Sequence, residues 1–306
     1  MNPLTAYEAI GFVLGLIFGS FLNVCIARLP KHESVVHPRS RCLQCGAGIR
    51  WYDNLPVVSW LALRGRCRDC KGSIALHYPL VEIALGLWFA FQAQEIYTLI
   101  YLSPTHDLVS DVIVHVGLAV LGFLLIGLMV MDWQTQLLPD AFTLVGLAIS
   151  FFLTCVRAFL LGPNEDQVVL SNHHIQLTSV GAATDPGNIF LTGPERLLGD
   201  WLLAVSCAAA ILLLIRWLYR AARHREGMGL GDVKLLALIA AFLGFWHAIL
   251  ALFLGVLIAS VYAIILLARG KAGASSKLAF GSFLAVGGLL AALYGEKLIS
   301  VYKTLL

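Results

Sequence analysis

Long apolar stretches recur along this chain, and they limit its fold more than any other feature of the sequence. Most of them reach the roughly 18–20 residues that an α-helix needs to cross a bilayer. Charged residues make up 13% of the chain, against about 25% in soluble domains. The sequence therefore predicts an all-α polytopic membrane protein with about eight transmembrane helices. They are expected at about 8–27, 79–103, 109–131, 138–161, 197–219, 231–244, 246–268 and 282–303.

Two parts of this pattern leave alternatives open. The sixth stretch, 231–244, is short for a span, and Gly244 with Trp246–His247 marks a tight turn after it. The sixth and seventh stretches are therefore either two spans or one bent hairpin, which would give six or seven spans. The polar stretch 162–196 has little apolar periodicity, so we expect an extracytoplasmic loop there. It is either a variable surface insertion or a region that contacts substrate.

The distribution of Lys and Arg predicts the orientation in the membrane. The loop 28–78 holds nine of them, and basic residues also follow the fifth and seventh stretches. Because basic loops stay in the cytoplasm, we expect these loops inside and both termini outside. No Lys or Arg precedes the first stretch, so a retained helix over 1–27 fits better than a signal peptide. A net charge of +3 gives nucleic-acid binding no support.

The loop 28–78 contains two Cys-x-x-Cys pairs, and twenty-one residues separate them. This spacing is typical of a tetrahedral four-thiolate zinc site. Four protein ligands leave no open position, so the zinc would be structural and would help a loop without a large core to fold. Two disulfides are the alternative, which a reducing cytoplasm disfavours. Gly46 and Gly72 follow the pairs, where turns often need glycine. The cysteines are Cys42, Cys45, Cys67 and Cys70.

Two aspartates lie at the ends of apolar stretches, where ionisable side chains are costly and mark functional sites. Asp132 ends the third stretch, and Asp232 begins the sixth in the sequence Gly229-Leu-Gly231-Asp232. Both are expected at the cytoplasmic side, where they could face each other. Two close carboxylates can share one proton, so that one activates water while the other donates to a scissile carbonyl. This pattern indicates an aspartyl protease, and Gly229 and Gly231 would let a peptide backbone approach closely.

Other roles remain open for these polar residues. Asp132 could be an interfacial cap residue, and Asp232 could cap the sixth helix, a role compatible with catalysis. Asp140, after Pro139, is expected to cap the fourth helix and is the third catalytic candidate. Lys234 could bias the charge near Asp232 or reach the membrane interface. Paired intramembrane aspartates would also suit a proton- or cation-coupled transporter, although we find no inverted repeat.

Three groups of motifs together resemble the type IV prepilin peptidase family. The tetrad G-x-G-D is a weak signal alone, but its position at a membrane edge, with Asp132 and the cysteine loop, is specific. The likeness covers roughly 8–160 and 197–300. The motifs are Gly19–Val24 with Arg28–Pro30, Pro38–Glu82 around the cysteines, and Asp132–Asp140 with Glu226–Leu236.

This resemblance implies a bifunctional enzyme of the bacterial inner membrane. Asp132 and Asp232 would cut the basic leader from type IV prepilins and type II secretion pseudopilins at the cytoplasmic face. Members with the cysteine loop usually also N-methylate the new N-terminal residue with S-adenosylmethionine, so we expect that second activity. The residues that bind the methyl donor are not evident. Asp53 and Glu82 are the candidates, with salt bridges to the loop's arginines as the alternative.

The expected layout has three parts: a first helix at 1–27, a zinc loop at 28–78 that would carry methyl transfer, and a peptidase core at 79–306 with the insertion at 162–196. The partners would be the pilin-like substrates and membrane lipid. The apolar helix of a prepilin would pack among the spans. Gly11, Gly15 and Gly19 are spaced for such a contact, or for packing within the protein. A membrane component that binds pilus subunits without cutting them is the remaining alternative.

Overall fold

The computed structural model describes most of the chain. The described residues are 3–42, 44–102, 108–161, 166–171, 174–179, 194–223, 229–270 and 278–305.

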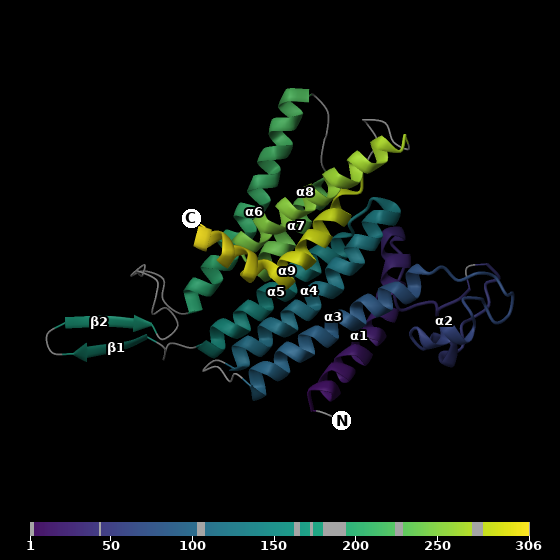
Figure 1. Cartoon of the computed structure of the whole chain (residues 1–306), viewed down its shortest axis with the longest axis horizontal. Helices are drawn as coiled ribbons and strands as arrows, with labels where there is room; N and C mark the ends of the chain where they lie inside the picture. The colour runs from purple at the N-terminus through teal and green to yellow at the C-terminus, as the bar shows by residue number, and fades with distance from the viewer. Residues whose placement is uncertain are drawn as a thin grey trace.

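Long helices packed side by side form the body of the protein (Figure 1). Among the described residues, seven helices are long and apolar enough to cross a membrane. This confirms the all-α polytopic membrane fold. The seven helices are α1 (Pro3–Arg28), α3 (His77–Tyr101), α4 (Leu108–Thr135), α5 (Asp140–Leu161), α6 (Pro194–Arg223), α8 (Phe245–Ala268) and α9 (Phe280–Leu305).

The short sixth stretch is helix α7 (Leu230–Leu243). Its 14 residues extend about 21 Å, less than the roughly 30 Å of a bilayer's hydrocarbon core. Gly244 joins it to α8 with φ of +82°, a backbone conformation that favours glycine. The tight turn expected at this point is therefore present, and α7 with α8 forms a hairpin of one short and one full-length helix.

The cysteine-rich segment lies beside one end of the bundle, between the end of α1 and the start of α3 (Figure 1). We call this end of the bundle the cysteine-loop end. The segment contains only short helices, η1 (Leu29–Lys31), η2 (Trp51–Asn54) and α2 (Val58–Ala62). Its compact form therefore depends on turns and side-chain contacts more than on regular structure.

Between α5 and α6, the structure adds an element that the sequence did not predict. Strands β1 (Asp166–Ser171) and β2 (His174–Ser179) pair antiparallel, with Asp166 opposite Ser179. Their β-branched residues favour strands, but the runs are short and polar, so no clear alternation stands out in the sequence. Residues 194–196, expected at the end of the insertion, instead begin α6. The insertion's other residues, 162–165, 172–173 and 180–193, lie outside the described part of the chain.

Helices α1 and α3 pack closely through the three glycines of α1. A Cβ at Gly11 would lie 2.7 Å from the Ala93 Cβ, and one at Gly19 would lie 2.7 Å from the Glu82 Cα. Glycine is required at such positions because the two backbones touch. Of the two roles expected for this face, packing within the protein is the one that the structure supports.

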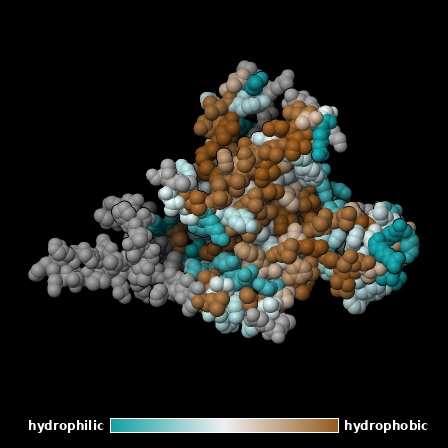
Figure 2. Space-filling view, in the orientation of Figure 1, coloured by the Kyte–Doolittle hydropathy of each residue, from teal (hydrophilic) through white to brown (hydrophobic). Residues whose placement is uncertain are grey.

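Apolar side chains cover the outside of the bundle (Figure 2). Many large ones are exposed, including Phe152 at 65%, Leu203 at 61% and Ile264 at 64%. In this view, hydrophilic residues cover much of the cysteine-rich segment and form smaller patches toward the ends of the bundle (Figure 2). A soluble protein rarely exposes apolar patches of this extent, so this surface belongs to a multi-pass membrane protein.

Candidate active site and metal centre

The structure brings Asp132 and Asp232 together near the cysteine-loop end of the bundle. Asp132 lies in the last turns of α4, and Asp232 lies in the first turn of α7. Their exposed fractions are 5% and 9%. Leu138 links the two positions, because a Cβ at Gly231, next to Asp232, and a Cβ at Gly281, beside Asp132, would each lie 3.0 Å from Leu138 Cδ1. Two acids from helices 100 residues apart in sequence therefore share one buried environment.

Ser282, in the first turn of α9, binds the Asp132 carboxylate. Its backbone N–H donates to Asp132 Oδ2 at 2.7 Å, and its Oγ lies 3.0 Å from the same oxygen. The sequence did not predict this residue as part of the site. A serine at the start of an apolar stretch carries no distinctive pattern, and only the packing of α9 on α4 brings it to Asp132.

Tight contacts around Leu138 close the site on one side. A Cβ at Gly231 would lie 3.0 Å from Leu138 Cδ1, and a Cβ at Gly281 would lie 3.0 Å from both that atom and Asp132 Oδ2. Gly229 differs, because among the described residues, which leave out 224–228, a Cβ there would meet no atom closer than 3.8 Å. Among the described residues, packing is therefore tighter around Gly231 than around Gly229.

Lys234 and Asp140 form an ion pair at the edge of this site. Lys234 Nζ lies 2.6 Å from Asp140 Oδ1, which joins the first turn of α7 to the first turn of α5. Asp140 is mostly exposed, with 61% of its side-chain surface accessible. The charge of Lys234 is thus paired with Asp140, and Asp140 lies outside the buried aspartate pair.

The four cysteines of the loop come together as predicted. Their Sγ atoms all lie within 4.8 Å of one another, and the Cys42 and Cys70 sulfurs are 3.9 Å apart. None of them forms a disulfide. A tetrahedral site with metal–sulfur distances of about 2.3 Å separates its sulfurs by about 3.8 Å. The arrangement therefore fits one metal ion held by four thiolates.

Two equivalent turns position the sulfurs. In the first, the Cys42 N–H donates to the Ala47 carbonyl at 2.8 Å, and in the second the Cys67 N–H donates to the Gly72 carbonyl at 2.8 Å. Gly46 and Lys71 occupy the left-handed position that follows each pair, with φ of +73° and +59°. We expected glycine at both positions, but Lys71 takes the second place and Gly72 follows it.

Backbone amides also favour the thiolate form within the first turn. The N–H groups of Cys45 and Gln44 point at the Cys42 sulfur and lower the pKa of that thiol to about 6. The Ala47 backbone lowers the pKa of Cys45, but the hydrogen bonds that Cys45 shares with Cys70, Cys42 and Cys67 outweigh it and raise that pKa to about 11. Of this pair, Cys42 is therefore the first to form the thiolate that binds metal.

The two candidates for methyl-donor binding have other contacts. Arg68 donates to both carboxylate oxygens of Asp53, at 2.8 and 2.6 Å. This fork lowers the pKa of Asp53 and ties η2 to the second cysteine turn. Glu82 is buried in α3 and accepts a hydrogen bond from the Val57 N–H at 2.7 Å. Asp53 therefore forms the salt bridge to a loop arginine that was the alternative to methyl-donor binding. Glu82 does not, because its partner is a backbone amide.

The contact between Glu82 and Val57 attaches the loop to the bundle. Val57 has φ of +58°, a left-handed conformation that is rare for a β-branched residue. Asn23 of α1 donates to the Tyr78 carbonyl at 3.0 Å and lies 3.5 Å from Glu82. These contacts fix α1, α3 and the loop to one another at a single buried point.

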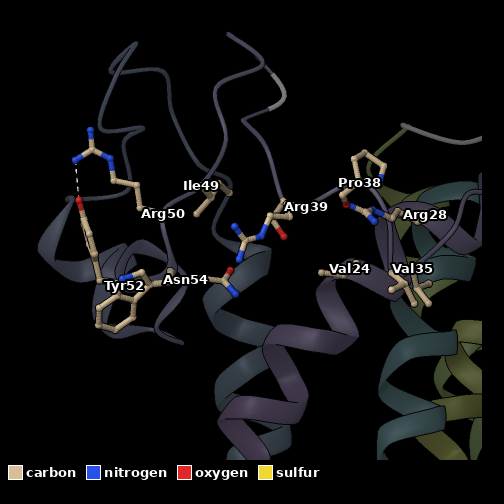
Figure 3. Close-up of a pocket in the computed structure, with 12 residues that line it drawn as sticks. Val24, Arg28, Val35, Pro38, Arg39, Ile49, Arg50, Tyr52 and Asn54 are labelled. Carbon is tan, nitrogen blue, oxygen red and sulfur yellow. Dashed lines mark hydrogen bonds between the residues drawn. The ribbon is translucent and has the colours of Figure 1, made fainter.

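A cavity of about 550 Å³ lies between the end of α1 and the loop. Its labelled arginines are spread along it in Figure 3, where Arg50 points at the Tyr52 hydroxyl. The lining contains aromatic and basic side chains but no carboxylate, and neither Asp53 nor Glu82 is part of it. It consists of Val24, Arg28, Val35, Val36, Pro38, Arg39, Ser40, Ile49, Arg50, Trp51, Tyr52 and Asn54.

Comparison with known families agrees with this geometry. The model of the bacterial Peptidase A24 N-terminal domain matches residues 13–96, and that of the type IV leader peptidase family matches residues 186–264. A prepilin leader peptidase/N-methyltransferase of Pseudomonas putida is 31% identical over 320 aligned residues, which cover 96% of this chain and 93% of that protein. The chain belongs to the type IV leader peptidase family. The four cysteines and Asp232 fall within the two matched ranges, whereas Asp132 lies between them.

Further members of this family are similar to the chain. The prepilin leader peptidase/N-methyltransferase of Myxococcus xanthus is 36% identical over 264 residues, covering 86% of this chain and 64% of that protein. The protein of the same name from Stutzerimonas stutzeri is 29% identical, with 98% and 95% covered. No solved structure matches the chain. These peptidase relatives give the transporter interpretation no support.

Proposed function

We propose that this chain removes the leader peptide of type IV prepilins and type II secretion pseudopilins, and that it then N-methylates the new N-terminal residue. The observation that carries the first activity is the buried pair Asp132 and Asp232, supplied by α4 and α7. The support for N-methylation comes from the relatives, which are named prepilin leader peptidase/N-methyltransferase. A merely structural role would not require two acids in one apolar environment, because unpaired buried charge is costly.

Peptide hydrolysis follows from two carboxylates that share one proton. Repulsion between the carboxylates disfavours the doubly ionised state, so one of them stays protonated. The ionised aspartate takes a proton from water, which attacks the scissile carbonyl. The protonated aspartate donates to the carbonyl oxygen and then helps the amine leave. We place the substrate backbone beside Gly229, just before α7, where the described residues leave more room than at Gly231.

The proposed topology places this chemistry at the cytoplasmic face of the bacterial inner membrane. The basic loop 28–78 would lie in the cytoplasm, with both termini on the other side. The first helix, residues 1–27, and the peptidase core, 79–306, would then surround the apolar helix of the substrate within the lipid. A basic leader would stay in the cytoplasm by the same charge rule, so its junction with the helix would reach the aspartates.

We propose zinc as the metal of the four-cysteine site. Zinc favours four thiolates in a tetrahedron, and Cys42, Cys45, Cys67 and Cys70 fit that geometry. With all four positions taken by protein, the ion would hold the loop in shape and would not touch the substrate. Its contribution to methyl transfer would be to fix the loop against α1 and α3.

The cavity at the end of α1 is the proposed place for S-adenosylmethionine. Its volume of about 550 Å³ is large enough for a nucleoside-sized ligand. Trp51 and Tyr52 could stack on an adenine, and Arg39 could pair with the donor's carboxylate. The bound donor supplies a methyl group to the free amine. Asp53 and Glu82 would then support the cavity from outside, through Arg68 and Val57.

Substitution of the aspartates tests the proteolytic activity. We expect Asp132→Asn and Asp232→Asn each to abolish trimming of a co-expressed prepilin, as judged by gel shift and mass analysis of its N-terminus. Asp140→Asn is the matched control, because Asp140 lies nearby but outside the pair, and it should retain cleavage. Cleavage by both of the first two variants would reject the proposal.

A further inference from the structure

Ser282 offers two hydrogen-bond donors to the aspartate site, and each donor has a choice of two acceptors. The backbone N–H lies 2.7 Å from Asp132 Oδ2 and 3.2 Å from the Ala279 carbonyl. The hydroxyl Oγ lies 3.0 Å from Asp132 Oδ2 and 2.9 Å from the Met129 carbonyl. Ser282 itself is 3% exposed, so water cannot replace these partners freely.

The hydroxyl carries a single proton, which can turn toward either acceptor. When Asp132 is ionised, its oxygen is the stronger acceptor, because hydrogen bonds to charged groups are the strong ones. When Asp132 is neutral, the Met129 carbonyl can take the hydroxyl proton instead. No buried donor is left without a partner in either state, so the change of charge avoids the penalty of an unmade hydrogen bond.

Both donors act on the same oxygen of Asp132. An oxygen that accepts two hydrogen bonds is a poor place for a proton, so Oδ2 stays unprotonated while Ser282 points at it. A shared proton would then lie on Asp232 or between Asp232 and Asp132 Oδ1. Asp232 accepts a single backbone hydrogen bond, from Gly229, against the two that Ser282 can give to Asp132, so the balance still favours charge on Asp132. Lys234 is paired with Asp140, and the ring of Tyr262 in α8 packs edge-on against Trp133.

We propose that Ser282 is a positioning residue that makes Asp132 the ionised member of the pair, and that its hydroxyl follows the charge of Asp132 through each turnover. Asp132 then takes the proton from water, and Asp232 is the acid that donates to the scissile carbonyl. This assignment rests on the proposed proteolytic function. It gives the two aspartates different roles, which their sequence motifs alone do not.

The pH dependence of cleavage tests this assignment. Ser282→Ala removes the hydroxyl donor but keeps the backbone N–H, so ionised Asp132 loses part of its stabilisation. Asp132 must then lose its proton at higher pH, and the acidic limb of the kcat profile should move upward by about one pH unit. KM for a prepilin should stay within about twofold, because Ser282 does not touch substrate. Profiles would be measured on purified full-length protein in lipid nanodiscs.

Matched variants separate this effect from a loss of structure. Ser150 is equally buried and hydrogen-bonded, to the Ala241 carbonyl at 2.7 Å, but it has no contact with the aspartates. Ser150→Ala should leave the acidic limb in place. Ser282→Thr and Ser282→Val have the same shape and differ only in the hydroxyl. The Thr variant should keep the wild-type limb, and the Val variant should show the shift even if Ser282→Ala folds poorly.

Three results would overturn the assignment: superimposable profiles for wild type and Ser282→Ala, an equal shift in Ser150→Ala, or identical profiles for the Thr and Val variants. Failure of the wild-type protein to cut any prepilin is a different outcome. It would reject the proposed function itself and is seen before any variant is compared.

Discussion

At the scale of single residues, the site depends on how closely the start of α9 approaches Asp132. Ser282 binds the carboxylate, and Gly281 leaves only enough room for it, since a Cβ there would lie 3.0 Å from Asp132 Oδ2. The sequence predicted Asp132, Asp232 and the four cysteines, because charge in an apolar stretch and paired thiols are unusual. It could not predict Ser282 or Gly281, because small residues are common in membrane helices and their partners lie 150 residues away.

Gly281→Ala tests this close approach. The added methyl group would press on both Asp132 Oδ2 and Leu138 Cδ1, so the carboxylate must move from its position beside Ser282. We expect kcat for prepilin cleavage to fall by at least about tenfold, since misplacement of a catalytic group by about 1 Å costs roughly a hundredfold. Gly199→Ala is the control, because a Cβ there meets no described atom within 4 Å, and it should keep wild-type kcat. Unchanged kcat in Gly281→Ala would show that the contact has no catalytic importance.

At the scale of elements, the first helix is held against α3 by backbone contact. The Gly15 position shows this best, because a Cβ there would lie 2.7 Å from the Gly86 Cα. The spacing of the glycines predicted a helix-packing face, but not its partner, since a substrate helix would need the same small residues. Only the arrangement of the bundle assigns the face to α3.

We expect Gly15→Ala to destabilise the protein. Neither backbone can move without separating the helices, and overpacking of this kind typically costs about 1–3 kcal/mol. The measurement is the thermal unfolding midpoint in detergent. Leu14→Ala, on the neighbouring and 45% exposed face of α1, should change the midpoint much less. Equal midpoints for Gly15→Ala and the wild type would contradict the tight contact.

The ion pair between Asp53 and Arg68 predicts a pH dependence of the cysteine-rich segment. Arg68 lowers the pKa of Asp53 in the folded loop, so the pair stabilises the loop above the unfolded pKa of about 3.9. This contribution is lost as pH falls through the lower, folded value. Hydrogen exchange across residues 51–68 should therefore increase in wild type as the pH drops below about 4. In Asp53→Asn, hydrogen exchange should rise less over the same pH range, because the ion pair is already missing. An equal rise in the variant and the wild type would contradict a stabilising role for the pair.

At the scale of the whole molecule, the protein combines a bundle of membrane helices with the cysteine-rich segment between α1 and α3. The sulfurs of Cys42, Cys45, Cys67 and Cys70 come together in that segment. The apolar stretches predicted the long spans well, because lipid imposes strong rules on sequence. They did not decide whether α7 crosses the membrane, because its 14 residues are too few for a full span and too apolar for a loop. The hairpin of β1 and β2 was also missed, because short polar strands give little periodicity.

Metal removal should separate the two parts of the molecule. We expect about one zinc per chain by elemental analysis, and loss of that zinc in Cys42→Ser or after strong chelation. The loop at 38–76 should then exchange its amide hydrogens much faster, while the core around Leu128 and Leu236 stays protected. Cys25→Ser, at a buried cysteine of α1, should retain the metal. A metal-free native protein with a protected loop would contradict the four-thiolate site.

The central claim, that Asp132 and Asp232 work as one catalytic unit, is tested most directly by comparing single and double substitutions. The measurement is the single-turnover rate of prepilin cleavage by Asp132→Asn, Asp232→Asn and the variant that carries both. Groups that act together are strongly non-additive, so we predict that the double variant is no slower than either single variant within a few fold. Two moderate losses that multiply in the double variant would mean that the aspartates act independently, and that the shared-proton site proposed here is wrong.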